Sequence, residues 1–474
     1  MAESDAAISR PGRTAVVSGG GPVGAVTAIL LAKQGWNVQV YDLACLPSVR
    51  PAQQDHRAYR LTVASRGLRV LKLANVNMDP IIATQGTRFE AAMFKANGRK
   101  SLSASIPMTP DPPCVRVFRD EIALRIIHEA QRLFPQTIKF HHSIAVTNVD
   151  FERQLVHLDR DGSNTTEVGY DLLVGADGAS SVVRSALQQI MPDSYIRRYR
   201  HKQVYSMTQV TPSDPAEIPP HAVFQAHAMK DGIVLWDGRS STDCRVGLAV
   251  PQELADAIRQ GRIDNIIAML QSSGRSLPDY ARKAVIELVK SKPDFYPMPS
   301  WTYLSQLHGP RTVLLGDAAH TMSPVLGQGL NAGLEDVAVF AECLQQHHGN
   351  VDNALPAYNS LRLPDIQAVM TVNEVVASSE IGLSVQDQEG AHKLWLSGHK
   401  MLFVLHMASS TMLHKVAPSV FGGPRMLGLV MGTTPYRDFV STLYRDGVWF
   451  AGFVIAVLAF AICRSSMYSF GNFF

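Results

Sequence analysis

The sequence predicts an α/β protein in which a parallel-sheet domain is interrupted by a second, mostly antiparallel sheet and is followed by a helical region. Three observations predict this order. Strands of the buried, parallel type lie around residues 14–18 and 312–315, while residues 204–250 alternate in hydropathy and contain several prolines, as in an antiparallel sheet. From residue 331 onward the pattern is mainly helical. Because 474 residues are too many for one core, we expect separate domains.

The first element is a strand–helix–strand unit within residues 14–42 that contains a glycine-rich turn. Between its first strand and its helix, three glycines fit the G-x-G-x-x-G pattern: Gly19, Gly21 and Gly24. The first allows a tight turn, the second lets the backbone approach a pyrophosphate, and the third lets helix and strand pack closely. Asp42 ends the second strand, where it is placed to bind an adenosine ribose. The unit therefore predicts a Rossmann-type dinucleotide site.

A second cofactor-binding candidate follows the late strand, residues 312–315. Asp317 lies in Gly-Asp-Ala-Ala-His, and the run continues to the start of a helix at Gly329, Leu330 and Asn331. A nicotinamide-only enzyme has no use for a second site so far along the chain, whereas FAD needs an acceptor for its ribitol hydroxyls, which Asp317 supplies. The positive end of the helix would stabilise negative charge on the reduced flavin. His320 has two interpretations, and we favour a structural histidine over a catalytic one.

A third signal lies between these two. The apolar run 171–174 ends in Gly175-Ala176-Asp177-Gly178 and is followed by Ser180, Ser181 and Arg184. An Asp-Gly pair after a buried strand is by itself a turn signal. Its position between the other two motifs makes Asp177 a candidate cofactor residue.

These motifs predict a discontinuous, Rossmann-type FAD-binding domain with a substrate-binding sheet domain inserted into it. The expected ranges are 12–75, 107–190 and 297–370 for the FAD-binding domain, 76–106 and 191–296 for the sheet domain, 371–446 for a C-terminal helical region, and 447–463 for one transmembrane helix.

The transmembrane prediction depends on the sequence GVWFAGFVIAVLAFAIC at residues 447–463, which carries no charge. Seventeen apolar residues are at the lower limit for crossing a bilayer core. A buried core helix is the alternative, and we favour a tail anchor in membrane lipid, with Tyr444, Trp449 and Tyr468 at the interfaces. The catalytic part would face the cytosol, on the endoplasmic reticulum or the mitochondrial outer membrane.

Composition excludes other classes of function. The net charge is only +3 and there is no long basic run, so we expect no nucleic-acid partner. Five scattered cysteines form no CxxC pair and no zinc spacing, which indicates a reducing compartment and no structural metal.

The three motifs in this order resemble the class A FAD-dependent monooxygenases, the single-component aromatic hydroxylases. That resemblance implies that NADPH or NADH reduces the flavin without a second dinucleotide domain. It also implies that Asp177 and Arg184 contact FAD and NADPH. Arg119, which opens a predicted helix, matches the family's arginine that contacts the flavin cofactor.

Within the family, the chain is most similar to the kynurenine 3-monooxygenases, over nearly its whole length and including residues 358–365 and the C-terminal apolar segment. It departs from them at the groups that hold the substrate carboxylate. Ala92, or Glu90 if the register slips, stands at the arginine position, and Pro113 falls near the tyrosine position. Loss of the arginine would cost roughly 2–5 kcal/mol of binding. Arg88 is a nearby substitute, but we expect a substrate other than kynurenine.

The expected reaction is hydroxylation or epoxidation of an apolar or aromatic small molecule by O₂, through a flavin C4a-hydroperoxide. The sequence identifies no catalytic side chain for this chemistry. Two alternatives remain open: kynurenine 3-monooxygenase proper and an FAD-dependent isoprenoid reductase. A nicotinamide dehydrogenase and a non-catalytic prenyl-protein escort are disfavoured.

Overall fold

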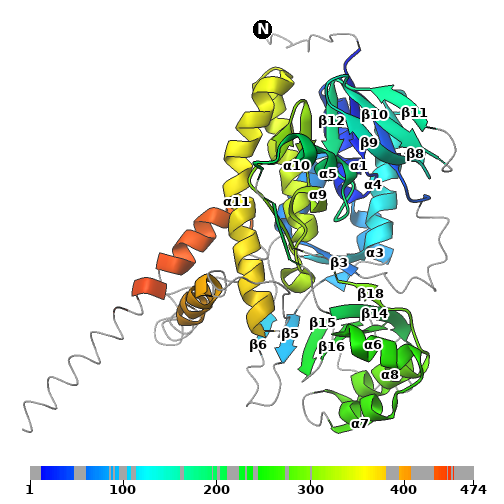
Figure 1. Cartoon of the computed structure of the whole chain (residues 1–474), viewed down its shortest axis with the longest axis vertical. Helices are drawn as coiled ribbons and strands as arrows, with labels where there is room; N and C mark the ends of the chain where they lie inside the picture. The colour runs from blue at the N-terminus through cyan, green and yellow to red at the C-terminus, as the bar shows by residue number, and fades with distance from the viewer. Residues whose placement is uncertain are drawn as a thin grey trace, which may run out of the picture.

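A computed structural model of the chain (Figure 1) shows a mixed α/β protein built around two large sheets. The residues that it describes are 12–46, 60–84, 87–88, 91–95, 104–107, 114–160, 165–194, 196–199, 203–210, 224–229, 232–238, 244–272, 277–298, 301–380, 394–406, 432–445, 447–449 and 452.

The first large sheet has six strands in the order β20-β21-β12-β1-β2-β8. All of its pairings are parallel except the one between β20 and β21. Its strands are β1 Thr14–Ser18, β2 Asn37–Asp42, β8 Ile138–His142, β12 Leu172–Gly175, β20 His308–Gly309 and β21 Thr312–Leu314. Strands from the first and last parts of the predicted FAD-binding domain therefore meet in one sheet, because β12 pairs with β1 on one side and with β21 on the other.

Helices α1, α4 and α5 contact this sheet, while α2 and α3 contact the small sheet of β3 (Arg60–Val63) and β7 (Val115–Phe118). Helix α1 packs on β1 and β2 and also contacts α4 and α10. The helices are α1 Pro22–Lys33, α2 Ser65–Leu73, α3 Asp79–Thr84, α4 Arg119–Leu133, α5 Val182–Ile190 and α10 Gly329–Gln346. An antiparallel three-stranded sheet lies beside α5 and consists of β9 Ala145–Asp150, β10 Leu155–Asp159 and β11 Thr165–Gly169.

The second large sheet has seven strands in the order β18-β14-β17-β16-β15-β5-β6, antiparallel except between β15 and β5. Its strands are β5 Ala91–Lys95, β6 Ala104–Pro107, β14 Gln203–Val210, β15 Phe224–Met229, β16 Gly232–Gly238, β17 Cys244–Pro251 and β18 Tyr296–Pro297. Helices α6 Gln252–Arg259, α7 Asp264–Ser272 and α8 Asp279–Lys290 share a separate hydrophobic core with it.

Two small antiparallel sheets complete the described strands. One contains β3 Arg60–Val63, β7 Val115–Phe118 and β4 Thr87–Arg88, and the other pairs β13 Ile196–Tyr199 with β19 Trp301–Leu304. The mixed α/β class and the predicted order of parallel, antiparallel and again parallel strands are thus confirmed. The division into four numbered domains stays a prediction.

The C-terminal part is helical. Helix α11 runs from Val351 to Glu380 and passes through residue 370, where the sequence had indicated a domain boundary. Shorter helices at 394–406 and 436–445 lie to one side of α11 (Figure 1). Among the helices of the described residues, none has both the length and the apolar character needed to cross a membrane. The predicted membrane segment, 447–463, lies outside these residues except at 447–449 and 452.

Candidate active site

The glycine-rich turn has the spacing of atoms that a phosphate site needs. Gly19 has a φ of +101°, and a Cβ there would lie 2.3 Å from the carbonyl oxygen of Ala176. A Cβ on Gly24 would lie 1.9 Å from the carbonyl oxygen of Gly19, so neither position has space for a side chain. A Cβ on Gly21, in contrast, would meet no atom within 4 Å. The turn is therefore closed where helix and strand pack and open at its middle glycine, where a pyrophosphate would approach.

Asp42 ends β2 and faces the turn. Its Oδ2 accepts a hydrogen bond of 2.6 Å from the backbone N–H of Gly20, and its Oδ1 accepts one of 2.7 Å from Ala44 N–H. A carboxylate has about four lone-pair sites, so it can accept ribose hydroxyls in addition to these two bonds.

Asp177 lies beside the same turn, because a Cβ on Gly19 would be 2.8 Å from the Cα of Asp177. Its Oδ2 accepts from the backbone N–H groups of Val182 at 2.8 Å and Val183 at 3.2 Å, which caps the start of α5. Its Oδ1 is buried and has no hydrogen-bond partner among the described residues. A buried acceptor of this kind fits a donor on a bound cofactor.

Arg184 ties the middle motif to the late one. Its buried guanidinium donates to the carbonyl oxygens of Ala179 at 2.6 Å and Ala318 at 2.8 Å. Ala179 lies two residues after Asp177, and Ala318 directly follows Asp317. Arg184 therefore fixes the position of the two acidic motifs relative to each other. The resemblance implied a cofactor contact for Arg184, and the bonds described here give it a positioning role.

Asp317 opens the short helix α9, Asp317–His320, and its side chain is exposed. The surrounding protein nevertheless desolvates this carboxylate, which raises its pKa, while Arg119, His320 and Arg184 act in the opposite direction. Arg119 is the first residue of α4, as predicted, and it is close enough to act on the charge of Asp317. A carboxylate that is open to solvent yet partly desolvated is suited to accept hydrogen bonds from hydroxyl groups.

The N-terminus of α10 faces the same place, since a Cβ on Gly329 would lie 3.8 Å from Oδ1 of Asp317. The helix begins at Gly329, so the backbone N–H groups of Gly329, Leu330 and Asn331 have no carbonyl partner in their own helix. The buried side chain of Asn331 accepts from Ala64 N–H at 2.8 Å and donates to the Thr62 carbonyl at 2.8 Å. Asn331 can therefore offer a ligand its backbone N–H, but its amide is used within the protein.

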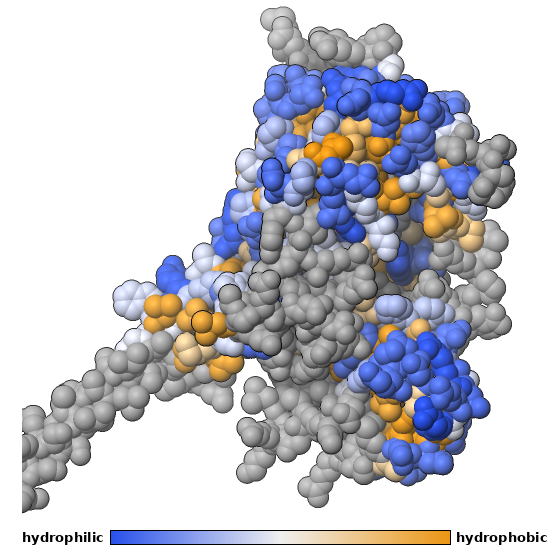
Figure 2. All heavy atoms as spheres, viewed as in Figure 1, coloured by the Kyte–Doolittle hydropathy of each residue, from blue (hydrophilic) through white to orange (hydrophobic). Residues whose placement is uncertain are grey.

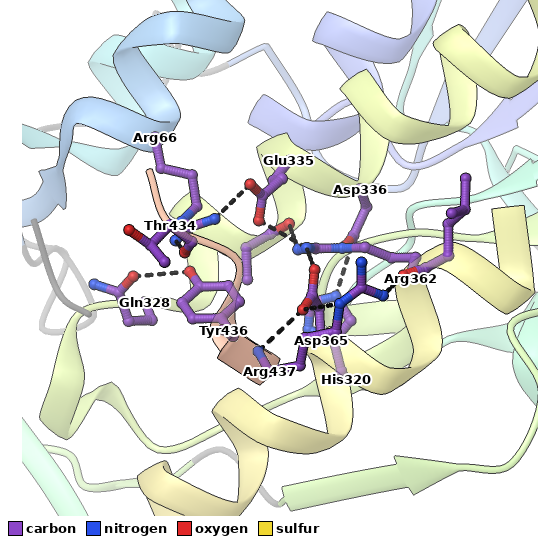
Figure 3. A network of polar contacts seen from close by, with 12 residues as sticks. Arg66, His320, Gln328, Glu335, Asp336, Arg362, Asp365, Thr434, Tyr436 and Arg437 are labelled. Atoms are coloured by element: carbon purple, nitrogen blue, oxygen red, sulfur yellow. Dashed lines mark hydrogen bonds and ion pairs between the residues drawn. The ribbon is translucent and has the colours of Figure 1, made fainter. Parts of the chain in front are cut away.

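A network of buried charges lies behind these motifs (Figure 3). Asp336 on α10 accepts from His320, from Gly316 N–H at 2.8 Å and from Arg362 Nε at 2.7 Å. Although burial opposes it, the combined effect of His320 and Arg362 lowers the pKa of Asp336 to about 2. His320 is itself buried, which favours its structural interpretation.

The same network continues toward the C-terminal helices. Glu335 accepts from Arg362 Nη1 at 2.7 Å and forms an ion pair with Arg66 of α2. Arg66 also donates to the carbonyl of Thr434 at 2.6 Å and lies over the ring of Tyr436, 3.9 Å from its centroid. The charges therefore connect α2, α10, α11 and helix 436–445.

The sequence reasoning missed this network. The available signal was the pair Glu335-Asp336 inside an apolar helical pattern, since buried acids require cationic partners. Arg362 was seen only as part of the similar segment 358–365.

A second buried cluster connects the second large sheet to the small sheet of β3, β7 and β4. Asp237 on β16 accepts from Arg116 Nη2 at 3.1 Å and lies 3.4 Å from Nη1 of Arg60. The guanidinium groups of Arg60 and Arg245 each lie 4.6 Å from the ring centroid of Phe118. Phe118 immediately precedes Arg119, so these contacts hold the start of α4 against the second sheet.

Of the positions that the sequence led us to expect to differ from the kynurenine 3-monooxygenases, two lie among the described residues. Ala92 lies in β5, where its backbone pairs with Phe224 and Ile106. Arg88 lies in β4, opposite Val115. Glu90 and Pro113 lie outside the described residues.

Comparisons with known proteins agree with this arrangement. The family model described as "FAD binding domain" matches residues 13–255 and 295–373. Kynurenine 3-monooxygenase of Phaeosphaeria nodorum is 26% identical over 431 residues, covering 85% of this chain and 84% of that protein. Violacein synthase of Chromobacterium violaceum is 25% identical over 461 residues, covering 92% and 98%.

Solved structures show the same fold. PqsL of P. aeruginosa in complex with 2-aminobenzoylacetate has a TM-score of 0.61 at 20% identity and covers 78% of this chain and 96% of that one. The tetrameric form of 2-methyl-3-hydroxypyridine-5-carboxylic acid oxygenase has a TM-score of 0.60 at 19% identity, covering 78% and 91%.

Proposed function

Because the chain belongs to the FAD-binding domain family and is a class A FAD-dependent monooxygenase, we propose that it uses NADPH or NADH and O₂ to hydroxylate or epoxidise an apolar or aromatic small molecule. Bound FAD supplies the electron transfer and oxygen activation. The chain must then bind the cofactor, hold the substrate beside it and exclude water.

One observation carries the proposal: two motifs almost 300 residues apart pack directly against each other. A Cβ on Gly316 would lie 3.1 Å from Cγ2 of Val23, in the first turn of α1. A Cβ on Gly333 would lie 3.1 Å from the Cα of Gly316, which joins α10 to the same point. The glycine turn and the Asp317 motif therefore border one site, as a cofactor with a diphosphate and a ribitol chain requires.

The proposed cofactor residues divide into two groups. Gly19, Gly21, Gly24 and Asp42 would hold the diphosphate and the adenosine ribose, and the open space at Gly21 supports this assignment. Asp317 would accept from the ribitol hydroxyls.

The N–H groups of Gly329, Leu330 and Asn331 would face the negative charge of the reduced ring. Asp177 and Arg119 complete the set, and the buried Oδ1 of Asp177 supports a donor from the cofactor there.

We further propose that the substrate lies between the flavin and the second sheet, and that it is not kynurenine. Ala92 in β5 supports this, because alanine supplies no charge for an amino-acid carboxylate. Kynurenine 3-hydroxylation remains the second candidate, favoured by the relative from Phaeosphaeria nodorum that matches 85% of this chain.

Two finer proposals concern organisation. The chain would divide at the residues expected from its sequence, with the second sheet as the substrate-binding domain. The uncharged segment 447–463 would anchor the enzyme in a membrane, with the flavin domain on the cytosolic side.

The deciding experiment uses purified full-length protein. The purified protein should show a flavin absorption spectrum. A panel of apolar and aromatic compounds that includes kynurenine is then screened for compounds that increase the rate at which the enzyme oxidises NADPH or NADH. Oxygen consumption, product and hydrogen peroxide are measured together. Oxygen consumption that is matched by product, and not by peroxide, identifies a monooxygenase. A substrate that is reduced without oxygen consumption would instead identify an isoprenoid-type reductase.

A further inference from the structure

Helix 394–406 presents an apolar surface to solvent. Leu394 is 77% exposed, Met401 61% and Val404 60%. The other exposed positions of this helix are Ser397 and Gly398, so none of its exposed positions is charged. Surface helices of soluble proteins usually place charged side chains on their outer face. In this helix the lysine, Lys400, is only partly exposed, and the more exposed positions are apolar or uncharged. Figure 2 shows apolar side chains gathered on this part of the molecule.

Packing on the opposite side of the helix fixes this orientation. Leu396 and Phe403 are buried in the core that also contains Val376 of α11 and Tyr436. The rings of Trp395 and His399 lie 4.0 Å apart, and His399 meets Tyr444 edge-on at 5.0 Å. The outward position of Leu394, Met401 and Val404 is therefore set by contacts of the helix with its neighbours.

The uncharged C-terminal segment starts on the same helix. A Cβ on Gly447 would lie 2.8 Å from the carbonyl oxygen of Leu402, so the chain passes directly over the helix backbone there. The next two residues, Val448 and Trp449, are 59% and 74% exposed. From this point the sequence continues without a charge to Cys463.

We propose that Leu394, Met401, Val404, Val448 and Trp449 form a lipid-contacting face that lies in the interface of a bilayer. Apolar side chains on one side of a helix enter the boundary between headgroups and acyl chains, and tryptophan favours that depth. The inference rests on the proposed anchoring by residues 447–463. A bilayer is the partner that we infer, because the proposed anchor begins at Gly447, in contact with helix 394–406. A membrane that held this anchor would therefore lie next to the exposed apolar side chains of the helix.

The face can be tested on the full-length enzyme reconstituted into phosphatidylcholine vesicles. The vesicles contain a phospholipid with a carbene-generating diazirine on its acyl chain, and adducts are located by proteolysis and mass spectrometry. We expect adducts in the peptide covering 394–406 as well as in the segment 447–463. Helix α8, which is also at the surface, should give only the background seen without light.

A matched pair of variants sharpens the test. The double variant Met401→Glu/Val404→Glu should lose adducts in 394–406 severalfold and keep those in 447–463. Leu73→Glu, an equivalent change at an exposed leucine of α2, should leave both unchanged. The flavin spectrum of each variant reports whether it has folded.

The outcomes separate the two ideas. Adducts in 447–463 without adducts in 394–406 would overturn the lipid-contacting face and leave the anchor intact. Adducts in neither segment would contradict both the lipid-contacting face and the membrane anchor. Cross-links between 394–406 peptides of two copies, in place of lipid adducts, would identify a dimer contact and also overturn the proposal.

Discussion

The Nε2 atom of His320 lies 2.5 Å from Oδ2 of Asp336, and both side chains are almost completely buried. The same carboxylate oxygen accepts the backbone N–H of Gly316. One side chain of α10 thus fixes both ends of the Gly-Asp-Ala-Ala-His turn that presents Asp317.

Asp336→Asn should destabilise the enzyme strongly. The substitution leaves Arg362 and His320 buried beside a neutral group, and breaking a buried ion pair in this way costs about 3–5 kcal/mol. Urea unfolding followed by circular dichroism measures the loss. Asp352→Asn removes a largely exposed ion pair with Arg311 and should change stability by less than about 1 kcal/mol. Equal effects of the two substitutions would contradict the buried network.

Asp336 should also make the protein sensitive to acid. Its pKa falls from 3.8 in the unfolded chain to about 2 in the fold, so the folded state favours the carboxylate. A depressed carboxyl pKa stabilises the fold above the unfolded value, and this contribution is lost as pH falls through the folded value. The loss should amount to about 2 kcal/mol. The gap in unfolding free energy between wild type and Asp336→Asn should therefore narrow between pH 4 and 2, and a constant gap would be inconsistent with this pKa.

Asp317→Ala should weaken FAD binding enough for the enzyme to lose its cofactor during purification. Loss of a charge-assisted hydrogen bond costs about 1.5–3 kcal/mol, which corresponds to a decrease in FAD affinity of roughly 10- to 100-fold. Titration of the apoprotein with FAD, followed by quenching of flavin fluorescence, measures the affinity. Asp279→Ala changes the exposed first residue of α8 and serves as the control. A yellow, active Asp317→Ala enzyme would refute the ribitol assignment.

The raised pKa of Asp317 predicts a second effect in the apoprotein. A carboxyl whose folded pKa is raised destabilises the fold as pH rises from its unfolded value through its folded value. Asp317→Asn should remove this pH-dependent decrease in unfolding free energy, so the variant apoprotein should be more stable than wild type at neutral pH. The same substitution should weaken FAD binding. Thermal unfolding of the apoprotein with and without FAD separates the two effects. A destabilised apoprotein at neutral pH would contradict this account.

Two glycines of the first turn should respond differently to alanine. In Gly24→Ala the Cβ meets the Gly19 carbonyl, so the apoprotein should lose about 1–3 kcal/mol or more. In Gly21→Ala the Cβ meets no protein atom, so the apoprotein should keep its stability and lose FAD affinity because the methyl group occupies the approach of the diphosphate. Urea unfolding and FAD titration of both variants provide the measurement. Unchanged FAD affinity in Gly21→Ala would place the diphosphate elsewhere.

The sequence predicted the elements that carry the candidate site where these depend on local chain geometry. The glycine turn, Asp42 and Asp317 belong to short motifs in which strand, turn and helix follow directly, and Arg119 opens α4 as expected. Hydropathy also separated the two large sheets, because buried parallel strands and half-exposed antiparallel strands differ in pattern.

What the sequence did not predict depends on long-range pairing. Arg66 and Glu335 are 269 residues apart, and nothing near either residue indicates its partner. Asp237 likewise forms ion pairs with arginines of β3 and β7 that are distant in sequence. Helix α11 also continues through Pro356 and Pro364, although proline usually ends or kinks a helix. Packing of α11 against α10 supports the helix at these positions, and this packing depends on residues distant in sequence.

The contact of Gly316 with Val23 has a consequence for biosynthesis. While the ribosome is still translating the second sheet, the nascent chain contains only the diphosphate half of the cofactor site. Stable FAD capture must wait until α10 has emerged from the exit tunnel. Messages that end before that helix should therefore yield colourless polypeptides, however well their first strands have folded.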